Sequence, residues 1–181
     1  MIAIDIPIGL LDVYVPGGRD CDREARKLLG QPRGSSVFSA PSRASLGARN
    51  YDEARPHHMS QQAFGILPKV RAVDEAMTPE LQDRVFESHP EVAFWSLAGR
   101  PMKNNKKRVA GREERLVALE EAEECVSIFP RIRESFAEDR KKFPRKEVAL
   151  DDFIDAYVMA CVAMRTRRSE TRKGSRRRRR L

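Results

Sequence analysis

The sequence lacks long hydrophobic runs and has few cysteines. No apolar stretch approaches the roughly twenty residues of a membrane-spanning helix, so we expect no membrane association. The apolar start contains Asp5 and Pro7 and no basic segment, which argues against a signal peptide. The three cysteines show no CxxC spacing, and no histidine stands at metal-finger distance. We therefore expect reduced thiols in a cytoplasmic protein and no structural zinc.

Segments of strand character are also scarce. Residues 1–6 form an almost uniformly apolar run, which predicts a strand buried on both faces. The other strand candidates are Ser36–Ser39 and Arg84–Ser88. Three short strands among many helices make a poor sheet. We expect an α/β chain with one domain and an incomplete sheet.

Helical patterns fill most of the remaining chain. Caps, prolines and glycines predict where these helices start and stop. The predicted helices cover residues 20–29, 42–55, 61–66, 69–77, 90–97, 111–127, 130–142 and 150–164. Asp22 and Arg26 are four residues apart on the first of these helices, which is typical of a modest surface ion pair.

The positive charge is concentrated at one end of the chain. Residues 165–181 contain ten Lys/Arg and one Glu, or +9, which leaves −1 of the total +8 for residues 1–164. Five consecutive arginines, Arg176 to Arg180, repel one another, so we expect residues 165–181 to be disordered and to bind polyanions without sequence specificity. A tail that only increases solubility is the alternative.

The predicted helix 150–164 carries the most informative carboxylates. Its apolar residues run nearly all the way round, which indicates a buried helix. Asp152 and Asp155 are three apart and share a face. Capping of the helix start explains Asp151 and Asp152, but it explains Asp155 poorly because Asp155 lies a full turn inside. A buried carboxylate is costly without a partner or a metal ion.

Two further carboxylates lie in apolar elements. Asp5 alternates to the face opposite Ile2, Ile4 and Ile6, which is a costly place for a charge unless a ligand site lies there. The alternative is that Asp5 caps the turn at the end of the strand. Glu87 lies at the carboxyl end of a predicted strand, where open α/β sheets place ligand sites, although a salt bridge would also explain it. If these acids converge with Asp152 and Asp155, their oxygens suit Mg²⁺ or Mn²⁺. Two such ions can promote phosphodiester hydrolysis.

Several motifs together resemble domain-of-unknown-function family 429. The matching segments are Ile4-Asp5-Ile6-Pro7-Ile8-Gly9-Leu10, Arg19-x-x-Asp22-x-x-x-Arg26, Glu87-x-His89-Pro90-Glu91-Val92, Lys106, Gly111-x-x-x-Arg115 and Asp152-x-x-Asp155-Ala156. The resemblance implies a nuclease with a ribonuclease H-like mixed sheet flanked by helices. It implies Asp5, Glu87 and Asp152 or Asp155 as catalytic metal ligands. It also implies that Arg19, Arg26, Lys106 and Arg115 line a phosphate-binding surface for nucleic acid.

The chain also departs from the fold that the resemblance implies. In this fold a three-stranded antiparallel unit with an early aspartate should come first, whereas the chain opens directly on the next strand. We therefore expect residues 1–164 to form a partial ribonuclease H-like domain, lacking the first three strands and impaired as a nuclease. One alternative is a non-catalytic nucleic-acid-associated protein that binds through its arginine tail. Another is a helical interaction module in which the acids only cap helices.

Overall fold

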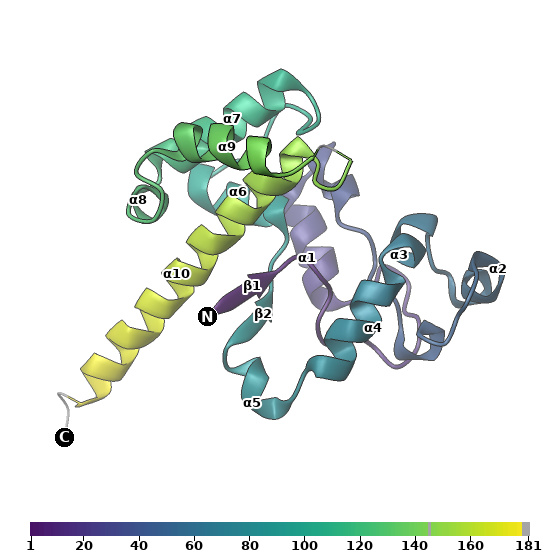
Figure 1. Ribbon diagram of the computed structural model, residues 1–181. Helices are drawn as coiled ribbons and strands as arrows, with labels where there is room; N and C mark the ends of the chain where they lie inside the picture. Colours follow the sequence, from purple (N-terminus) through teal and green to yellow (C-terminus); the bar gives the residue numbers. More distant parts are fainter. Residues whose placement is uncertain (145, 179–181) are drawn as a thin grey trace. The chain divides into compact units, whose positions relative to one another are not determined.

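The computed structural model describes residues 1–144 and 146–178, with side chains through Arg167 (Figure 1). The fold is mixed α/β and mostly helical, which confirms the expected α/β class. Its two strands, β1 (Ile2–Ile4) and β2 (Val85–Glu87), form a small parallel sheet. Ile2 in β1 is 51% exposed, so the prediction of a strand buried on both faces was wrong.

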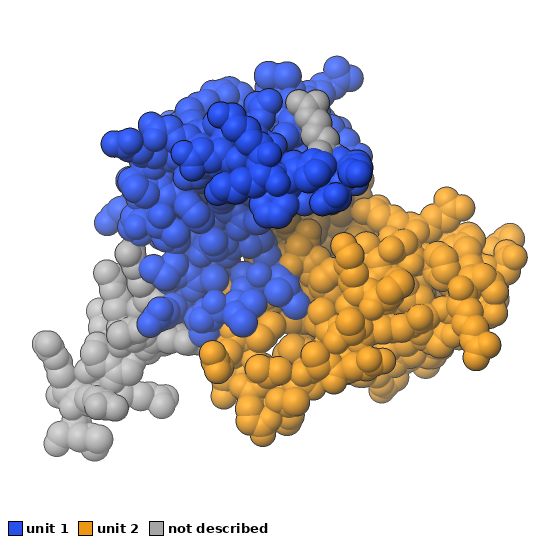
Figure 2. All heavy atoms as spheres, in the orientation of Figure 1, with its two compact units in different colours: residues 1–4, 93–181 blue, residues 5–92 orange. Residues whose placement is uncertain are grey.

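The chain divides into two compact units. Unit 1 comprises residues 1–4 and 93–181, and unit 2 comprises residues 5–92 (Figure 2). The sequence pattern did not indicate this division, because residues 92 and 93 lie inside the predicted helix 90–97, with no linker-like segment between the two units. Helix α6 (Pro90–Ala98), which begins at the predicted proline, spans the boundary along the sequence.

Unit 2 consists of short helices joined by turns. Its α-helices are α1 (Asp20–Leu29), α2 (Tyr51–Ala54), α3 (Gln61–Gly65), α4 (Leu67–Ala76) and α5 (Pro79–Gln82). Three 3-10 turns, η1 (Arg33–Ser36), η2 (Arg43–Ser45) and η3 (Arg55–His57), complete the set. Ser60 caps α3, which matches the helix predicted over residues 61–66, by accepting the Ala63 N–H at 3.1 Å. A small apolar core including Ala54, Ala63 and Leu67 holds α2, α3 and α4 together.

Two predicted elements of unit 2 differ in the structure. The strand expected at Ser36–Ser39 is absent, because Ser36 ends η1 and its hydroxyl donates to Arg33 O at 2.8 Å. Such local hydrogen bonds compete with strand pairing. The single helix expected over 42–55 is broken into η2 and α2, and Asn50 caps the second piece by accepting the Glu53 N–H at 3.0 Å.

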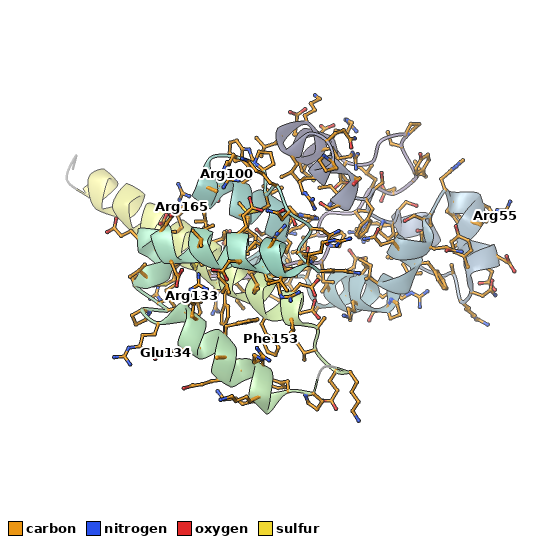
Figure 3. The ribbon with its side chains drawn as sticks, turned by 90° about the horizontal axis from the view of Figure 1, so that it is seen from above. Arg55, Arg100, Arg133, Glu134, Phe153 and Arg165 are labelled. Carbon is orange, nitrogen blue, oxygen red and sulfur yellow. A yellow bond between two sulfur atoms is a disulfide. The ribbon has the colours of Figure 1, made fainter. Side chains whose placement is uncertain are left out.

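Unit 1 is built from longer helices around a larger core. Its helices after α6 are α7 (Val109–Glu121), α8 (Glu123–Val126), α9 (Ile132–Lys142) and α10 (Leu150–Arg178). Phe94, Leu119, Ile154 and Val158 are buried at its centre. At the surface, Arg133 of α9 (Figure 3) bridges Glu113 and Glu120 of α7 at 2.6 and 2.7 Å. The acidic face of α7 is therefore partly paired with α9.

A disulfide between Cys125 of α8 and Cys161 of α10 lies in the core of unit 1. The expectation of three reduced thiols was therefore wrong, and Cys21 is the free cysteine. The sequence spacing gave no sign of the pair, because the two cysteines are 36 residues apart and meet only when α8 packs on α10.

Helix α10 continues beyond Met164, where the predicted helix ended, to Arg178. The remainder of the predicted disordered tail, residues 179–181, lies outside the described residues. Within the described part of the chain, no helix has the length and apolar content needed to cross a membrane.

Candidate functional site

The four predicted carboxylate ligands fall into two pairs. Asp5 and Glu87 belong to unit 2, whereas Asp152 and Asp155 belong to unit 1. Among the side chains that the structure describes, those of residues 1–144 and 146–167, no group of three or more His, Cys, Asp and Glu is placed to hold a metal ion. Each pair is therefore described with its own neighbours.

In unit 2, Glu87 is bound by the guanidinium of Arg19. Arg19 Nη1 donates to Glu87 Oε2 at 2.6 Å, and Nη2 donates to Oε1 at 2.7 Å. The backbone joins this contact, because Ile8 N donates to Glu87 Oε2 at 2.8 Å and Arg19 Nη1 donates to Ile8 O at 2.6 Å. This bidentate pair is the salt bridge that was the alternative explanation of Glu87.

Arg19 is simultaneously paired with Asp22. Arg19 Nη2 donates to Asp22 Oδ1 at 2.6 Å, and Nε donates to Oδ2 at 3.2 Å. Only 7% of Arg19 and 3% of Asp22 is exposed. Burial alone would lower the pKa of Arg19, but the hydrogen bonds to Glu87 and Asp22 outweigh it and raise the pKa above its usual value. Burial would raise the pKa of Asp22, yet the bonds and charge of Arg19 keep it low.

These contacts correct two predictions for unit 2. Asp22 is not in a surface pair with Arg26, because its carboxylate is buried against Arg19. Arg26 instead donates to two backbone carbonyls, Val37 O at 2.9 Å and Gly17 O. Arg19 does not line a phosphate-binding surface, because its guanidinium is buried between two carboxylates. Asp5, the residue that follows β1, is exposed.

In unit 1, Asp155 is paired with Lys106, which lies in the loop between α6 and α7. Only 8% of Asp155 is exposed, and its Oδ2 accepts a hydrogen bond from Lys106 Nζ at 2.5 Å. Asp151 Oδ2 lies 3.7 Å from the same ammonium. Lys106 thus brings its charge to the start of α10, at two carboxylates that stand one helical turn apart.

Asp152 has a different role from Asp155. It is exposed, and its Oδ2 accepts the Ala149 N–H at 3.1 Å, which is the capping contact of the alternative explanation. The acid that shares Lys106 with Asp155 is Asp151. The spacing of four residues between Asp151 and Asp155 could have identified this pair, because such residues are neighbours on a helix.

Arg115 is a structural residue of unit 1. Its side chain is fully buried, and Nη1 donates to Asn104 O at 3.1 Å and to Gly111 O at 2.9 Å. Its guanidinium carbon lies 5.5 Å from the centre of the Phe94 ring. The implied place of Arg115 on a phosphate-binding surface was therefore wrong.

Several of the paired residues belong to the sequence motifs that resemble domain-of-unknown-function family 429. A comparison with protein families confirms this resemblance. A family described as "Protein of unknown function (DUF429)" matches residues 1–177. The chain belongs to the DUF429 family. The searches of curated protein sequences and of solved structures found no match to the chain.

The geometry of this DUF429 chain defines what each pair can do. The oxygens of Asp151 and Asp155 stabilise a cation, and oxygen donors are those that Mg²⁺ and Mn²⁺ prefer. Glu87 differs, because both of its oxygens already accept hydrogen bonds from Arg19. The start of α10 is therefore the better candidate for cation binding.

Proposed function

We propose that this DUF429 chain is a metal-dependent nuclease of ribonuclease H-like type, with Mg²⁺ or Mn²⁺ as its cofactor. The proposal assigns Asp155 as the principal metal ligand. Asp5, Glu87 and Asp152 remain the other ligands that the resemblance implies. To these we add Asp151, because it faces the same ammonium as Asp155.

The observation that carries the proposal is the pairing of a buried carboxylate, Asp155, with the partly exposed ammonium of Lys106. Ile154 and Val158, on either side of Asp155 in α10, are fully buried, so the helix places a carboxylate in an apolar setting. Burying a carboxylate carries a desolvation cost, which its ion pair does not always repay in stability. Active sites commonly hold titratable side chains in a desolvated setting beside a specific charge partner. The burial of the Asp155 carboxylate therefore favours a catalytic role over a capping role.

The fit to a divalent cation differs between the two units. In unit 1, Asp151 and Asp155 already stabilise one positive charge, so metal binding requires only that Lys106 withdraw or share the site. In unit 2, Glu87 does not fit as it is held, because a metal would have to replace the bidentate contact with Arg19. The assignment of Glu87 therefore depends on the opening of that contact.

Divalent ions held by these carboxylates would stabilise charge on the attacking and leaving oxygens of a phosphodiester. The chain's own residues prepare this role. Asp151 and Asp155 hold the Lys106 ammonium in place, and Lys106 offsets the mutual repulsion of the two carboxylates.

The test is cleavage of labelled single-stranded DNA, duplex DNA and RNA in Mn²⁺ and, separately, in EDTA. We expect cleavage of at least one substrate that EDTA abolishes. Asp155→Asn should reduce the rate at least about tenfold. The matched control is Asp12→Asn, which makes the same charge change at an exposed site. The Asp12 side chain is 93% exposed, and its Oδ1 lies 3.8 Å from Arg43 Nε. Cleavage by Asp155→Asn at the wild-type rate, or no cleavage of any substrate by the wild type, would overturn the proposal.

The second candidate function is non-catalytic binding of nucleic acid by the arginine tail. The charge of +9 in residues 165–181 favours it. Ending the chain after Arg167 tests it cleanly, because this keeps the Arg165–Glu124 ion pair at 3.4 Å. This candidate predicts that the shortened chain loses nucleic-acid binding while Asp155→Asn binds normally. Undiminished binding by the shortened chain would exclude it.

A further inference from the structure

The loop between α6 and α7 is fixed by one carboxylate. Glu114 of α7 accepts the backbone N–H groups of Lys103 at 2.9 Å and Asn104 at 2.8 Å. Arg100, marked in Figure 3, donates to Glu114 Oε1 at 2.8 Å, and the Asn104 side chain donates to Oε2 at 3.2 Å. Burial would raise the pKa of Glu114, but these four donors lower it to about 2. The carboxylate is therefore charged at any physiological pH.

Two further residues of α7 hold the next part of the loop. The buried guanidinium of Arg115 donates to Asn104 O at 3.1 Å. Gly111 lets the loop pass against the helix, because a Cβ at this position would lie 2.0 Å from Asn105 O. The Gly111-x-x-Glu114-Arg115 pattern thus fixes the backbone of residues 103–105 from one face of α7.

The fixed loop presents cations to solvent. Lys107 and Arg108 are exposed, and over the described residues neither has a carboxylate within ion-pair distance. Arg112, one turn into α7, donates to Lys107 O at 2.8 Å and so ties this segment to the helix. A loop that is merely solvated does not require a buried arginine and a multiply bonded carboxylate to hold its backbone. This rigidity lowers the entropy cost of binding a ligand.

We propose that the loop 103–108 is a preorganised site for the phosphodiester backbone of nucleic acid. Lys107 and Arg108 contact the phosphates, and Glu114 is a positioning residue that holds them in place. Lys106 is not part of this contact, because its ammonium is directed to Asp155. The inference rests on the proposed function only in taking nucleic acid as the ligand. It assigns residues that the resemblance does not implicate.

The test measures binding of a fluorescein-labelled oligodeoxythymidine by fluorescence anisotropy, in EDTA and at several salt concentrations. The full chain is used for every variant. The double variant Lys107→Ala/Arg108→Ala should bind roughly tenfold more weakly. Its slope of log K against log salt should be shallower by about 1.4, the value for two phosphate contacts on a single strand. Unchanged affinity and slope would overturn the proposal.

Glu114→Gln separates positioning from simple charge. Removing a negative charge beside a cationic loop should tighten phosphate binding if only net charge matters. We expect weaker binding, by roughly threefold or more, because the loop loses its anchor. The matched control is Glu113→Gln on the same helix, which makes the same charge change at a residue that pairs with Arg133 and not with the loop. Binding by Glu114→Gln as tight as that of Glu113→Gln would overturn the positioning role.

The two proposals fail in different ways. Because binding is measured in EDTA, it does not depend on metal binding or on cleavage. A chain that cleaves no substrate but shows the expected Lys107 and Arg108 effects would contradict the nuclease and support the loop. A chain that cleaves in Mn²⁺ with an unaffected double variant would do the reverse.

Discussion

Arg19 is the residue on which the polar interior of unit 2 depends. It forms ion pairs with Asp22 and Glu87 at once, and both Arg19 and Asp22 are almost completely buried. Arg19→Met should lower the free energy of unfolding by about 3–5 kcal/mol, because it leaves an uncompensated carboxylate in the interior. Denaturant unfolding followed by circular dichroism measures this loss.

The control for Arg19 is a neighbouring arginine on the surface. Arg23 pairs with Asp20, whose side chain is 90% exposed. Exposed pairs contribute little, so Arg23→Met should cost less than about 1 kcal/mol. Equal losses for the two variants would contradict the central role of Arg19.

Glu114 predicts a stability effect with a defined pH range. Its pKa falls from 4.5 to about 2 on folding, so its contribution is present above pH 4.5 and is lost as the pH falls toward 2. At neutral pH, Glu114→Gln should destabilise the protein by about 1–2 kcal/mol, reflecting charge-assisted hydrogen bonds at a partly exposed site. Unfolding of both proteins at neutral pH and near pH 2 checks this. A difference that persists near pH 2 would contradict it.

At the scale of elements, Gly111 allows α7 to approach the preceding loop. Gly111→Ala places a Cβ within 2.0 Å of Asn105 O and 2.5 Å of its carbonyl carbon, so the backbone must move. We expect a loss of roughly 1–3 kcal/mol, as for other overpacking changes. Thermal unfolding measures it.

Gly65 in α3 provides the comparison, because a Cβ added there meets nothing within 4 Å. Gly65→Ala should be neutral or stabilising by up to about 1 kcal/mol, as helix propensity predicts. If Gly111→Ala were as stable as Gly65→Ala, the close contact between α7 and the loop would be excluded.

The contact between α8 and α10 is covalent through Cys125 and Cys161. Thiol titration of the denatured protein without reductant should detect one thiol, Cys21, and titration after reduction should detect all three cysteines. Reduction should cost about 2–4 kcal/mol of stability, as is typical of a disulfide that closes a loop. Three reactive thiols without reductant would contradict the pairing.

Local signals predicted the elements that local chemistry determines. The Ser60 cap, the start of α6 at Pro90 and α1 over Asp20–Leu29 all follow from nearby side chains. The strand expected at Ser36–Ser39 failed because local hydrogen bonds formed a 3-10 turn instead. The true extent of α10, to Arg178, was missed because the apolar pattern ends at Met164.

The candidate site was predictable only in part. The buried position of Asp155 followed from the apolar residues around it in the sequence. Its partner did not, because Lys106 is 49 residues away and reaches α10 only through a loop held by Glu114 and Arg115. The burial of Arg115 could not be predicted either, because nothing in its local sequence distinguishes a buried arginine from an exposed one.

At the scale of the whole molecule, the predicted site residues are divided between two compact units. Each unit contains its own paired charges, Arg19 with Glu87 in unit 2 and Lys106 with Asp155 in unit 1. Membership of DUF429 covers both units, because the match runs from residue 1 to residue 177. The nuclease proposal therefore concerns the full chain, and its tests use the full chain.

The most direct measurement is a calorimetric titration of Mn²⁺ into the wild type, Asp155→Asn and the control Asp12→Asn. Metal ligation by Asp155 predicts saturable Mn²⁺ binding to the wild type and to Asp12→Asn, with affinity at least about tenfold lower for Asp155→Asn. Equal affinity in all three proteins, or no saturable binding to the wild type, would contradict the assignment of Asp155 as a metal ligand.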